Sequence, residues 1–487
     1  MISNQEIIST LPMRNKFTGA LIALTLIASI FSPAHAQNQI QYPYYIVQNG
    51  DMLSNIADRF GVSLNDLITY NNISDPNFVS VGTQLIIPGL QGLQGQITTS
   101  PVQLGETLKG LTVKYQMDQE LLLKLNHVTS PGQIYAGSSL ILPVISGAKT
   151  KVPVAKVNSG QTLLETAVLN QTSMWDLLDE NNDQNQTSIL PGDLLYLNAA
   201  QDAKEISSID PKLTSVTISP LPLVQGDTFV ISVVSPQDVT LQGSLNGMPL
   251  NFFTSQANQQ VALQGVDAMA DPGLAPFILS GKFADGSSFN FEQSILLISG
   301  DYPTAAPLTV DPATIDPKIT QPEDQMIEKL TSKATPTRYW SGVFQSPDAN
   351  YGFPTEFNAL FGERRSYNNG SFLDFHTGVD FAGGVGLPIS APADGVVVFA
   401  GGPLTVRGNA TIIDHGWGVY SAYFHQSEID VKVGDSVKAG QIIGKVGNTG
   451  RVEDAGAFVG AGAHLHWEIW VNGIQVNPLE WLNNQYP

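Results

Sequence analysis

The chain has 487 residues, too many for one compact core, so its length predicts about three or more domains. Only 14% of the residues are charged, yet the formal net charge is -20. This balance argues against a nucleic-acid partner, because such partners need a basic surface. Cysteine is absent, which excludes disulfides, thiolate catalysis and thiolate-bound zinc. A metal site in this chain must therefore be built from His, Asp or Glu.

Residues 1–36 have the pattern of a secretory signal peptide. Basic residues precede an apolar run over residues 17–31, and a small-x-small sequence ends at Ala36. The run is shorter than the ~20 residues that a membrane span needs, so we expect cleavage after Ala36 and no transmembrane segment afterwards. Met13 stands directly before the basic residues and is a candidate for the true start. The protein is therefore expected to be secreted, and to act in the cell envelope, in the periplasm or outside the cell.

A repeat with a period of 55 residues follows in the N-terminal half of the chain. A fixed period of this length predicts several copies of one supersecondary unit. We expect three copies, at residues 44–90, 97–145 and 152–199. The residues that mark the period are Gly50, Gly105 and Gly160, and Asn71, Asn126 and Asn181.

The first copy shows which elements the unit contains. Residues 45–47 predict a strand, and a helix with apolar residues at helical spacing is expected to begin at Asp51. Gly61 is expected to stop this helix, and Ser63 to cap a second one. Residues 85–87 then return as a strand, so the predicted unit is βααβ.

Three motifs of the first copy resemble the LysM module, a binder of cell-wall glycan. They are Tyr45-Ile-Val-Gln-Asn-Gly-Asp, Leu67-Ile-Thr-Tyr-Asn and Val81-Gly-Thr-Gln-Leu-Ile-Ile-Pro. The resemblance implies binding to GlcNAc-containing glycan of peptidoglycan. The second and third copies match more loosely, which leaves open whether they bind glycan or serve as spacers.

Residues 212–300 change character and consist of short apolar or alternating runs between turn-forming residues. Strands at this spacing predict a small β-sandwich of immunoglobulin-like type, and we expect a spacer or docking role for it. Residues 301–340 are rich in Pro, Thr, Asp and Ala, which predicts a semi-rigid extended linker with one short helix at residues 323–330. The chain is thus expected to be multidomain and mainly β.

Five of the seven histidines lie between residues 376 and 466. His376 and Asp380 are four residues apart, and His425 ends a short aromatic run. His464 and His466 stand two apart on a predicted strand, so that both rings lie on one face. Each pattern alone fits a polar residue in a turn or on a sheet. Together they supply His and Asp donors for a catalytic zinc site, which uses three protein ligands, and leave further histidines for proton transfer.

The order of motifs over residues 350–484 resembles the lysostaphin-type, or LytM-like, zinc endopeptidases of bacterial cell walls. The motifs are Phe361-Gly-Glu-Arg-Arg, His376-Thr-Gly-Val-Asp-Phe, Gly386-Leu-Pro-Ile-Ser-Ala-Pro-Ala-Asp-Gly-Val-Val, Ile413-Asp-His-Gly, Tyr423-Phe-His, Val433-Gly-Asp-Ser-Val-Lys-Ala-Gly-Gln-Ile-Ile-Gly, Gly447-Asn-Thr-Gly and His464-Leu-His-Trp-Glu. The resemblance implies an antiparallel β peptidase domain of barrel-sandwich hybrid type at residues 345–487.

The same resemblance assigns roles to individual residues. It implies that His376, Asp380 and His466 bind Zn2+, and that His425 and His464 are the catalytic histidines. The implied substrate is the stem peptide of peptidoglycan. His415 also matches a family position, but not a ligand position, and is interpreted as a structural hydrogen-bonding residue.

Several features leave alternatives open. Glu468 shares the strand face of His466 and is expected to orient that ring. Residues 451–463 are an insertion relative to the family pattern, at the lip of the expected cleft. A non-catalytic scaffold that binds the wall and activates a separate amidase is the main alternative to an enzyme. A lipoyl- or biotin-carrier-like sandwich is a further one, suggested by the hairpin at residues 433–440, but it gives the histidines no role.

Overall fold

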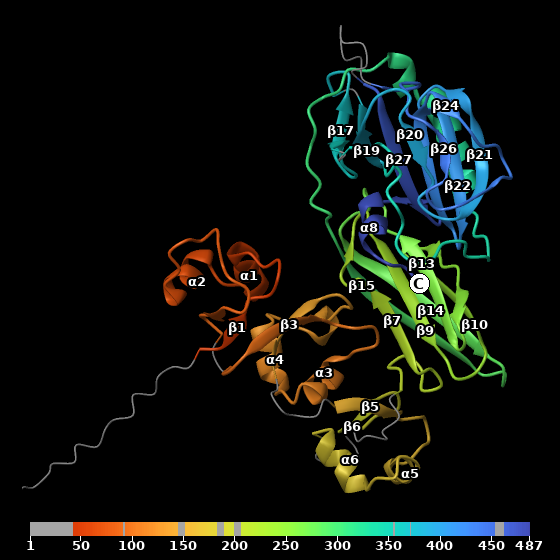
Figure 1. Cartoon of the computed structure of the whole chain (residues 1–487). Coiled ribbons are helices and arrows are strands. Elements are labelled where there is room, and N and C mark those ends of the chain that lie inside the picture. Colours follow the sequence, from red (N-terminus) through yellow and green to blue (C-terminus); the bar gives the residue numbers. More distant parts are fainter. Residues whose placement is uncertain are drawn as a thin grey trace, which may run out of the picture. The chain divides into compact units, whose positions relative to one another are not determined.

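The computed structural model describes residues 42–90, 93–144, 151–182, 189–198, 206–353, 356–370, 372–452 and 462–487. The expected signal peptide lies outside these ranges, as do residues 453–461 of the insertion. The fold is multidomain and mainly β, as predicted (Figure 1). Within the described ranges, no helix is both long enough and apolar enough to cross a membrane.

The repeat folds as three units of the same element order, strand, helix, helix, strand. In each unit the two strands pair antiparallel, and the helices follow each other between them. The elements are β1 (Tyr44–Ile46), α1 (Leu53–Phe60), α2 (Leu64–Asn71) and β2 (Gln84–Ile86); β3 (Ile97–Pro101), α3 (Leu108–Lys114), α4 (Gln119–Leu125), the 3-10 turn η1 (Pro131–Gln133) and β4 (Ser139–Pro143); and β5 (Lys151–Lys156), α5 (Leu163–Leu169), α6 (Met174–Glu180) and β6 (Leu194–Asn198).

The helix boundaries in the first unit follow the predicted signals with one exception. Gly61 ends α1 in the left-handed conformation, and the Ser63 hydroxyl accepts a hydrogen bond from the amide of Asp66 at 3.0 Å. However, α1 begins at Leu53 and not at Asp51. The Asp51 carboxylate accepts bonds from the Gln48 amide and the Tyr45 hydroxyl, both at 2.7 Å, which hold it in the turn before the helix.

The repeated asparagine has the same structural role in all three units. It stands at the end of the second helix, and its side chain donates to and accepts from the backbone of one residue of the closing strand. In the third unit, the Asn181 amide group donates to Tyr196 O at 2.9 Å, and its oxygen accepts from Tyr196 N at 2.8 Å. The equivalent pairs are Asn71 with Ile86 and Asn126 with Ile141. The asparagine that recurs every 55 residues therefore clamps the second helix of each unit to its closing strand.

Replacement of Asn181 by alanine should open this clamp. The loss leaves buried backbone groups of Tyr196 without partners, at a cost of about 1–3 kcal/mol in local stability. We expect the Tyr196 amide to exchange with solvent at least tenfold faster in hydrogen-exchange mass spectrometry or NMR. Asn170→Ala is the matched control, because within the described residues the side chain of Asn170 donates to Thr166 O, four residues earlier in α5. Unchanged protection of Tyr196 in Asn181→Ala would contradict the clamp.

Residues 215–298 form two sheets that share one core, so the predicted β-sandwich is present. The strand orders are β11-β10-β14-β15-β8 and β12-β13-β9-β7. Phe229 and Ile231 from one sheet and Phe277 and Leu279 from the other lie in the same buried cluster. The strands are β7 (Ser215–Ser219), β8 (Leu223–Val224), β9 (Thr228–Val234), β10 (Val239–Leu245), β11 (Met248–Pro249), β12 (Phe253–Gln256), β13 (Gln259–Gly265), β14 (Gly273–Phe283) and β15 (Ser288–Ile298).

The segment before the C-terminal domain differs from the extended linker expected at residues 301–340. Bridges from Thr304 to Arg364 and from Leu308 to Tyr367 join it to strand β17 (Arg364–Tyr367). It continues through η3 (Pro312–Ile315) into a full helix, α7 (Pro317–Thr331), where a short helix was expected. The helix is long because Ile327 is fully buried in a cluster with aromatic residues of the C-terminal sheet. Tertiary packing thus overrides a proline-rich composition.

The C-terminal domain is built on an eight-stranded antiparallel sheet in the order β16-β19-β27-β23-β22-β21-β25, with β28 paired to β27. Figure 1 shows these strands in teal and blue. A second sheet has the order β20-β26-β24. The remaining elements are β16 (Phe357–Ala359), β18 (Phe372–Phe375), β19 (Val379–Ala382), β20 (Pro388–Ser390), β21 (Gly395–Leu404), β22 (Gly408–Gly416), β23 (Val419–Gln426), β24 (Glu428–Ile429), β25 (Ser436–Val437), β26 (Ile442–Lys445), β27 (His464–Val471), β28 (Ile474–Val476) and α8 (Pro478–Asn483).

Candidate metal centre and cleft

Strand register brings together the polar residues that the sequence placed far apart. In the β19–β27 pair, Asp380 lies directly opposite His466. In the β23–β27 pair, Phe424 lies opposite His466, and His425 follows it. Along β27, Leu465 and Trp467 are fully buried in the core on the other face. The predicted alternation of this strand is therefore confirmed.

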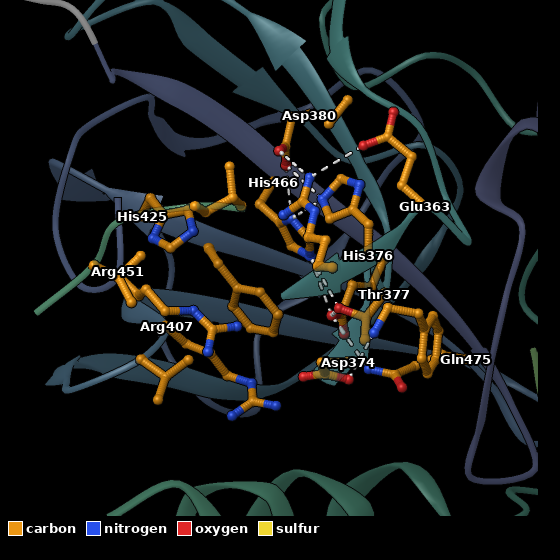
Figure 2. Close-up of a pocket in the computed structure, with 18 of the residues that line it drawn as sticks. Glu363, Asp374, His376, Thr377, Asp380, Arg407, His425, Arg451, His466 and Gln475 are labelled. Carbon is orange, nitrogen blue, oxygen red and sulfur yellow. Dashed lines mark hydrogen bonds and ion pairs between the residues drawn. The ribbon is translucent and has the colours of Figure 1, made fainter. Parts of the chain in front are cut away.

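Three donor atoms meet at the centre of this arrangement, as Figure 2 shows. Asp380 Oδ1 lies 3.0 Å from His376 Nε2 and 2.7 Å from His466 Nδ1. The two imidazole nitrogens are themselves 3.0 Å apart. All three side chains are buried, and their donor atoms lie within 4.8 Å of one another. Two nitrogens and a carboxylate oxygen converging in this way are a suitable donor set for a metal ion.

The second nitrogen of each ring fixes its orientation. His376 Nδ1 lies 2.8 Å from Leu360 O, and His466 Nε2 lies 3.1 Å from Glu468 Oε1. A proton on each of these outer nitrogens would leave the inner nitrogens to bind a metal ion. Glu468 is held in turn by the indole of Trp470 at 2.7 Å. The expected contact between Glu468 and His466 is thus confirmed.

Burial and charge shift the pKa values of the three donors in the metal-free cluster. Burial is the largest influence on Asp380 and would raise its pKa, but the neighbouring His376 and His466 outweigh it and hold the pKa well below the usual range. Burial also lowers the pKa of His376. For His466, burial is outweighed by Asp380 and Glu468, which raise its pKa to about 9. The carboxylate is therefore ionised and ready to bind a cation at neutral pH.

His425 and His464 stand beside the cluster but are oriented by other groups. His425 Nδ1 lies 2.7 Å from Thr449 O, and His464 Nδ1 lies 2.7 Å from Gly462 O. The two rings are 4.9 Å apart between centroids, and His464 Nε2 lies 3.7 Å from Asp380 Oδ1. Burial, together with the neighbouring histidines, holds the pKa of His425 well below its usual range. Each ring thus offers its Nε2 atom for proton transfer next to the cluster.

The two other histidines of the described chain lie outside the site, as expected. His415 is fully buried, with Nδ1 2.8 Å from Asp394 O and Nε2 2.8 Å from the Ser421 hydroxyl. The bonds join β22 to the turn before β21 and to β23, so the role of His415 is structural. His127 is exposed in the second repeat unit.

The three residues of the cluster line a cavity of about 610 Å3. Three arginines line the cavity, Arg365, Arg407 and Arg451, as do Asp324 and other residues of α7. Figure 2 shows Arg407 and Arg451 along the same hollow as His425. No sequence pattern predicted that these residues line one cavity, because arginines separated by tens of residues and a helix in a proline-rich segment carry no common motif.

Comparison with known protein families agrees with this geometry. The model of peptidase family M23 matches residues 374–478, which include the His-Asp-His cluster and both neighbouring histidines. The chain contains an M23 peptidase domain. The LysM domain model matches residues 45–88 and 102–143, so the chain also contains two LysM domains.

Similar proteins include both peptidases and an activator. The chain is 30% identical over 244 residues to the murein hydrolase activator NlpD of Salmonella dublin. The aligned region covers 50% of this chain and 57% of that protein. It is 42% identical over 104 residues to the DD-carboxypeptidase/endopeptidase Mpg of Neisseria meningitidis serogroup B, covering 21% of this chain and 22% of that protein. The chain therefore spans just over half of the first relative and about a fifth of the second.

Among solved structures, the catalytic domain of lysostaphin from Staphylococcus simulans is 30% identical and is covered over 99% of its length. It aligns with 29% of this chain, with a TM-score of 0.23.

Proposed function

We propose that this chain is a zinc-dependent endopeptidase that hydrolyses peptide cross-links of bacterial peptidoglycan. The observation that carries the proposal is the complete site: His376, Asp380 and His466 converge, and His425 and His464 stand beside them. The LysM domains would hold the enzyme on the glycan of its substrate, which raises the local substrate concentration. We further propose that the protein is exported and works in the cell envelope, the periplasm or outside the cell.

Zinc fits the donor set better than other common ions. Imidazole and carboxylate donors in a three-residue site are typical of catalytic zinc, whereas Ca2+ and Mg2+ prefer oxygen ligands. When bound, zinc supplies a Lewis acid that lowers the pKa of water and polarises a carbonyl group. His376, Asp380 and His466 would hold it, and Leu360 O and Glu468 would keep the two rings in the binding orientation.

The two remaining histidines supply the proton transfers. Because Nδ1 of each ring faces a backbone carbonyl, a proton on Nδ1 leaves Nε2 of a neutral ring able to accept one. One ring would accept the proton of the attacking water at Nε2. The other, when protonated, would stabilise the oxyanion or donate to the leaving amine. Their separation of 4.9 Å between ring centroids lets both reach one scissile bond.

Replacement of Glu468 by glutamine tests the support of the metal centre. The substitution keeps the size of the side chain but removes the charge that faces His466 Nε2 at 3.1 Å. Loss of such a carboxylate partner lowers metal affinity about 10–100-fold. Zinc affinity is measured by competition with a chromophoric chelator, with Glu428→Gln as the control on an exposed carboxylate of the same domain. Equal affinity in Glu468→Gln and the wild type would contradict this role.

A second candidate function is activation of a separate amidase by a wall-bound scaffold. The similarity to an activator over 50% of the chain favours it. The retained His-Asp-His cluster and the two adjacent histidines favour the peptidase, because a scaffold has no need of them.

The two functions differ in the bonds that are cut. Purified cross-linked peptidoglycan is incubated with the protein alone, and then with an added amidase, and the fragments are analysed by mass spectrometry. The peptidase proposal predicts cleaved cross-links with the protein alone, and the stem peptides remain attached to the sugars. Intact cross-links in the absence of amidase, together with faster amidase cleavage in its presence, would identify an activator and reject the peptidase.

A further inference from the structure

Arg407 occupies a fixed position in the cavity wall, close to the metal centre. Its side chain is only 11% exposed, and its guanidinium lies 5.5 Å from the centroid of the Phe424 ring. Phe424 also stacks with the ring of His466. The two ring centroids are 5.7 Å apart, and the interplanar angle is 14°. A positive charge is therefore held one aromatic ring away from the proposed zinc ligand.

Two adjacent carboxylates of α7 approach this guanidinium in different ways. Glu323 is 11% exposed, and its carboxylate accepts hydrogen bonds from the amides of Thr405 and Val406 while its Oε2 lies 3.7 Å from Arg407 Nη1. Asp324 is 56% exposed and contacts Arg407 Nη2 through Oδ1 at 2.8 Å. Glu323 thus anchors the helix to the loop before β22. Asp324 makes an ion pair at the edge of the cavity, where solvent weakens such pairs.

The hydrogen bonds of the guanidinium are incomplete, although Glu323 lies near Nη1. Within the described chain, Arg407 Nη1 is buried and has no hydrogen-bond partner. An arginine fork binds a carboxylate best through two parallel hydrogen bonds. Asp324 is bonded through Nη2 alone, so this exposed ion pair lacks the second bond of the fork and is open to exchange with another carboxylate.

We propose that Arg407 binds a free carboxylate of the peptide substrate, and that Asp324 occupies this position until the substrate displaces it. The inference rests on the proposed function, because it places an acidic peptide in the same cavity. It adds a specificity residue that favours carboxylate-bearing over amidated peptides. Glu323 and the buried Ile327 keep α7 in place while the Asp324 side chain turns away.

The test measures binding to the metal-free full-length protein, so that it does not depend on hydrolysis. The probes are the peptide L-Ala-γ-D-Glu-L-Lys-D-Ala and two amidated forms, one with a carboxamide at the D-Glu α-carboxylate and one with a carboxamide at the C-terminus. Dissociation constants are determined by isothermal titration calorimetry. We expect one of the amidated forms to bind about tenfold or more weakly than the acid, which identifies the recognised carboxylate. Equal binding of all three peptides would overturn the proposal.

Variants of both partners separate recognition from a structural role. Arg407→Gln should remove the preference for the acid peptide, and Arg407→Lys should keep part of it, because the charge remains but the fork is lost. Asp324→Asn should tighten binding of the acid peptide about two- to fivefold by removing the internal competitor. Glu428→Gln is the matched control, because it removes the charge of an exposed carboxylate of the same domain whose ion-pair partner is Lys445; it should leave the affinities unchanged.

Two outcomes would reject the carboxylate subsite. A preference that persists in Arg407→Gln would assign recognition to another residue. If Asp324→Asn lowers the unfolding temperature and leaves peptide affinity unchanged, the ion pair serves only to attach α7. A preference for the acid peptide in a protein that cuts no cross-links would retain the subsite and reject only the peptidase function.

Discussion

Replacement of His466 by alanine is expected to abolish peptidoglycan hydrolysis, with a loss of at least about 10³-fold, and to remove stoichiometric zinc binding. The reason is geometric: His466 Nδ1 lies 2.7 Å from Asp380 Oδ1 and 3.0 Å from His376 Nε2, so its ring closes the donor set. Without it, one imidazole and one carboxylate remain. Metal content is measured by mass spectrometry of the desalted protein, and activity by release of soluble fragments.

The control for this substitution is His127→Asn. His127 is exposed, lies in the second repeat unit and has a positive backbone φ of 53°, which asparagine tolerates. The control should retain both zinc and activity. Retained zinc and full activity in His466→Ala would show that the cluster is not the catalytic metal site.

Replacement of His425 or His464 by alanine is expected to lower turnover about 10²–10⁴-fold without loss of zinc. Neither ring belongs to the cluster of three donors, and each is oriented through Nδ1 by a backbone carbonyl. The measurement is kcat and metal content for each variant, followed by the pH dependence of kcat/KM. If the two rings act as acid and base, each variant should lose one limb of the pH profile. Loss of the metal in either variant would reassign that histidine as a ligand.

Much of the site could be predicted from the sequence because its residues lie in recognisable motifs. The four-residue spacing of His376 and Asp380 and the two-residue spacing of His464 and His466 made these residues candidates, and the resemblance to the lysostaphin-type family assigned their roles. The structure adds the strand register that brings them together, with Asp380 opposite His466. It also places Glu468 in contact with His466, as expected from their common strand face.

The remainder of the cavity could not be predicted, because its contacts cross long stretches of sequence. Arg407 and Asp324 are 83 residues apart, and α7 lies in a segment whose prolines indicate an extended chain. Pro317 is compatible with the first turn of a helix, where its missing amide is not needed, and buried Ile327 supplies the packing energy. Amino-acid composition alone predicts neither the tolerated proline nor the packing of Ile327.

The fold of the repeat was predictable, whereas part of the β-sandwich was not. The 55-residue period marks the three clamping asparagines as equivalent positions in the sequence alone. By contrast, β13 has no clear alternation, because Val261 and Leu263 face one buried cluster and Ala262 faces another. A strand buried on both faces lacks the period-2 signal on which its prediction depends.

The central claim is that the cluster of His376, Asp380 and His466 makes this chain a zinc-dependent endopeptidase. The most direct test incubates cross-linked peptidoglycan with the protein, with the protein after chelator treatment, and with the treated protein after zinc is restored. The account predicts that cross-link cleavage stops with the chelator and returns with zinc in the wild type but not in His466→Ala. Cleavage that continues in the chelator, or that returns fully in His466→Ala, would contradict it.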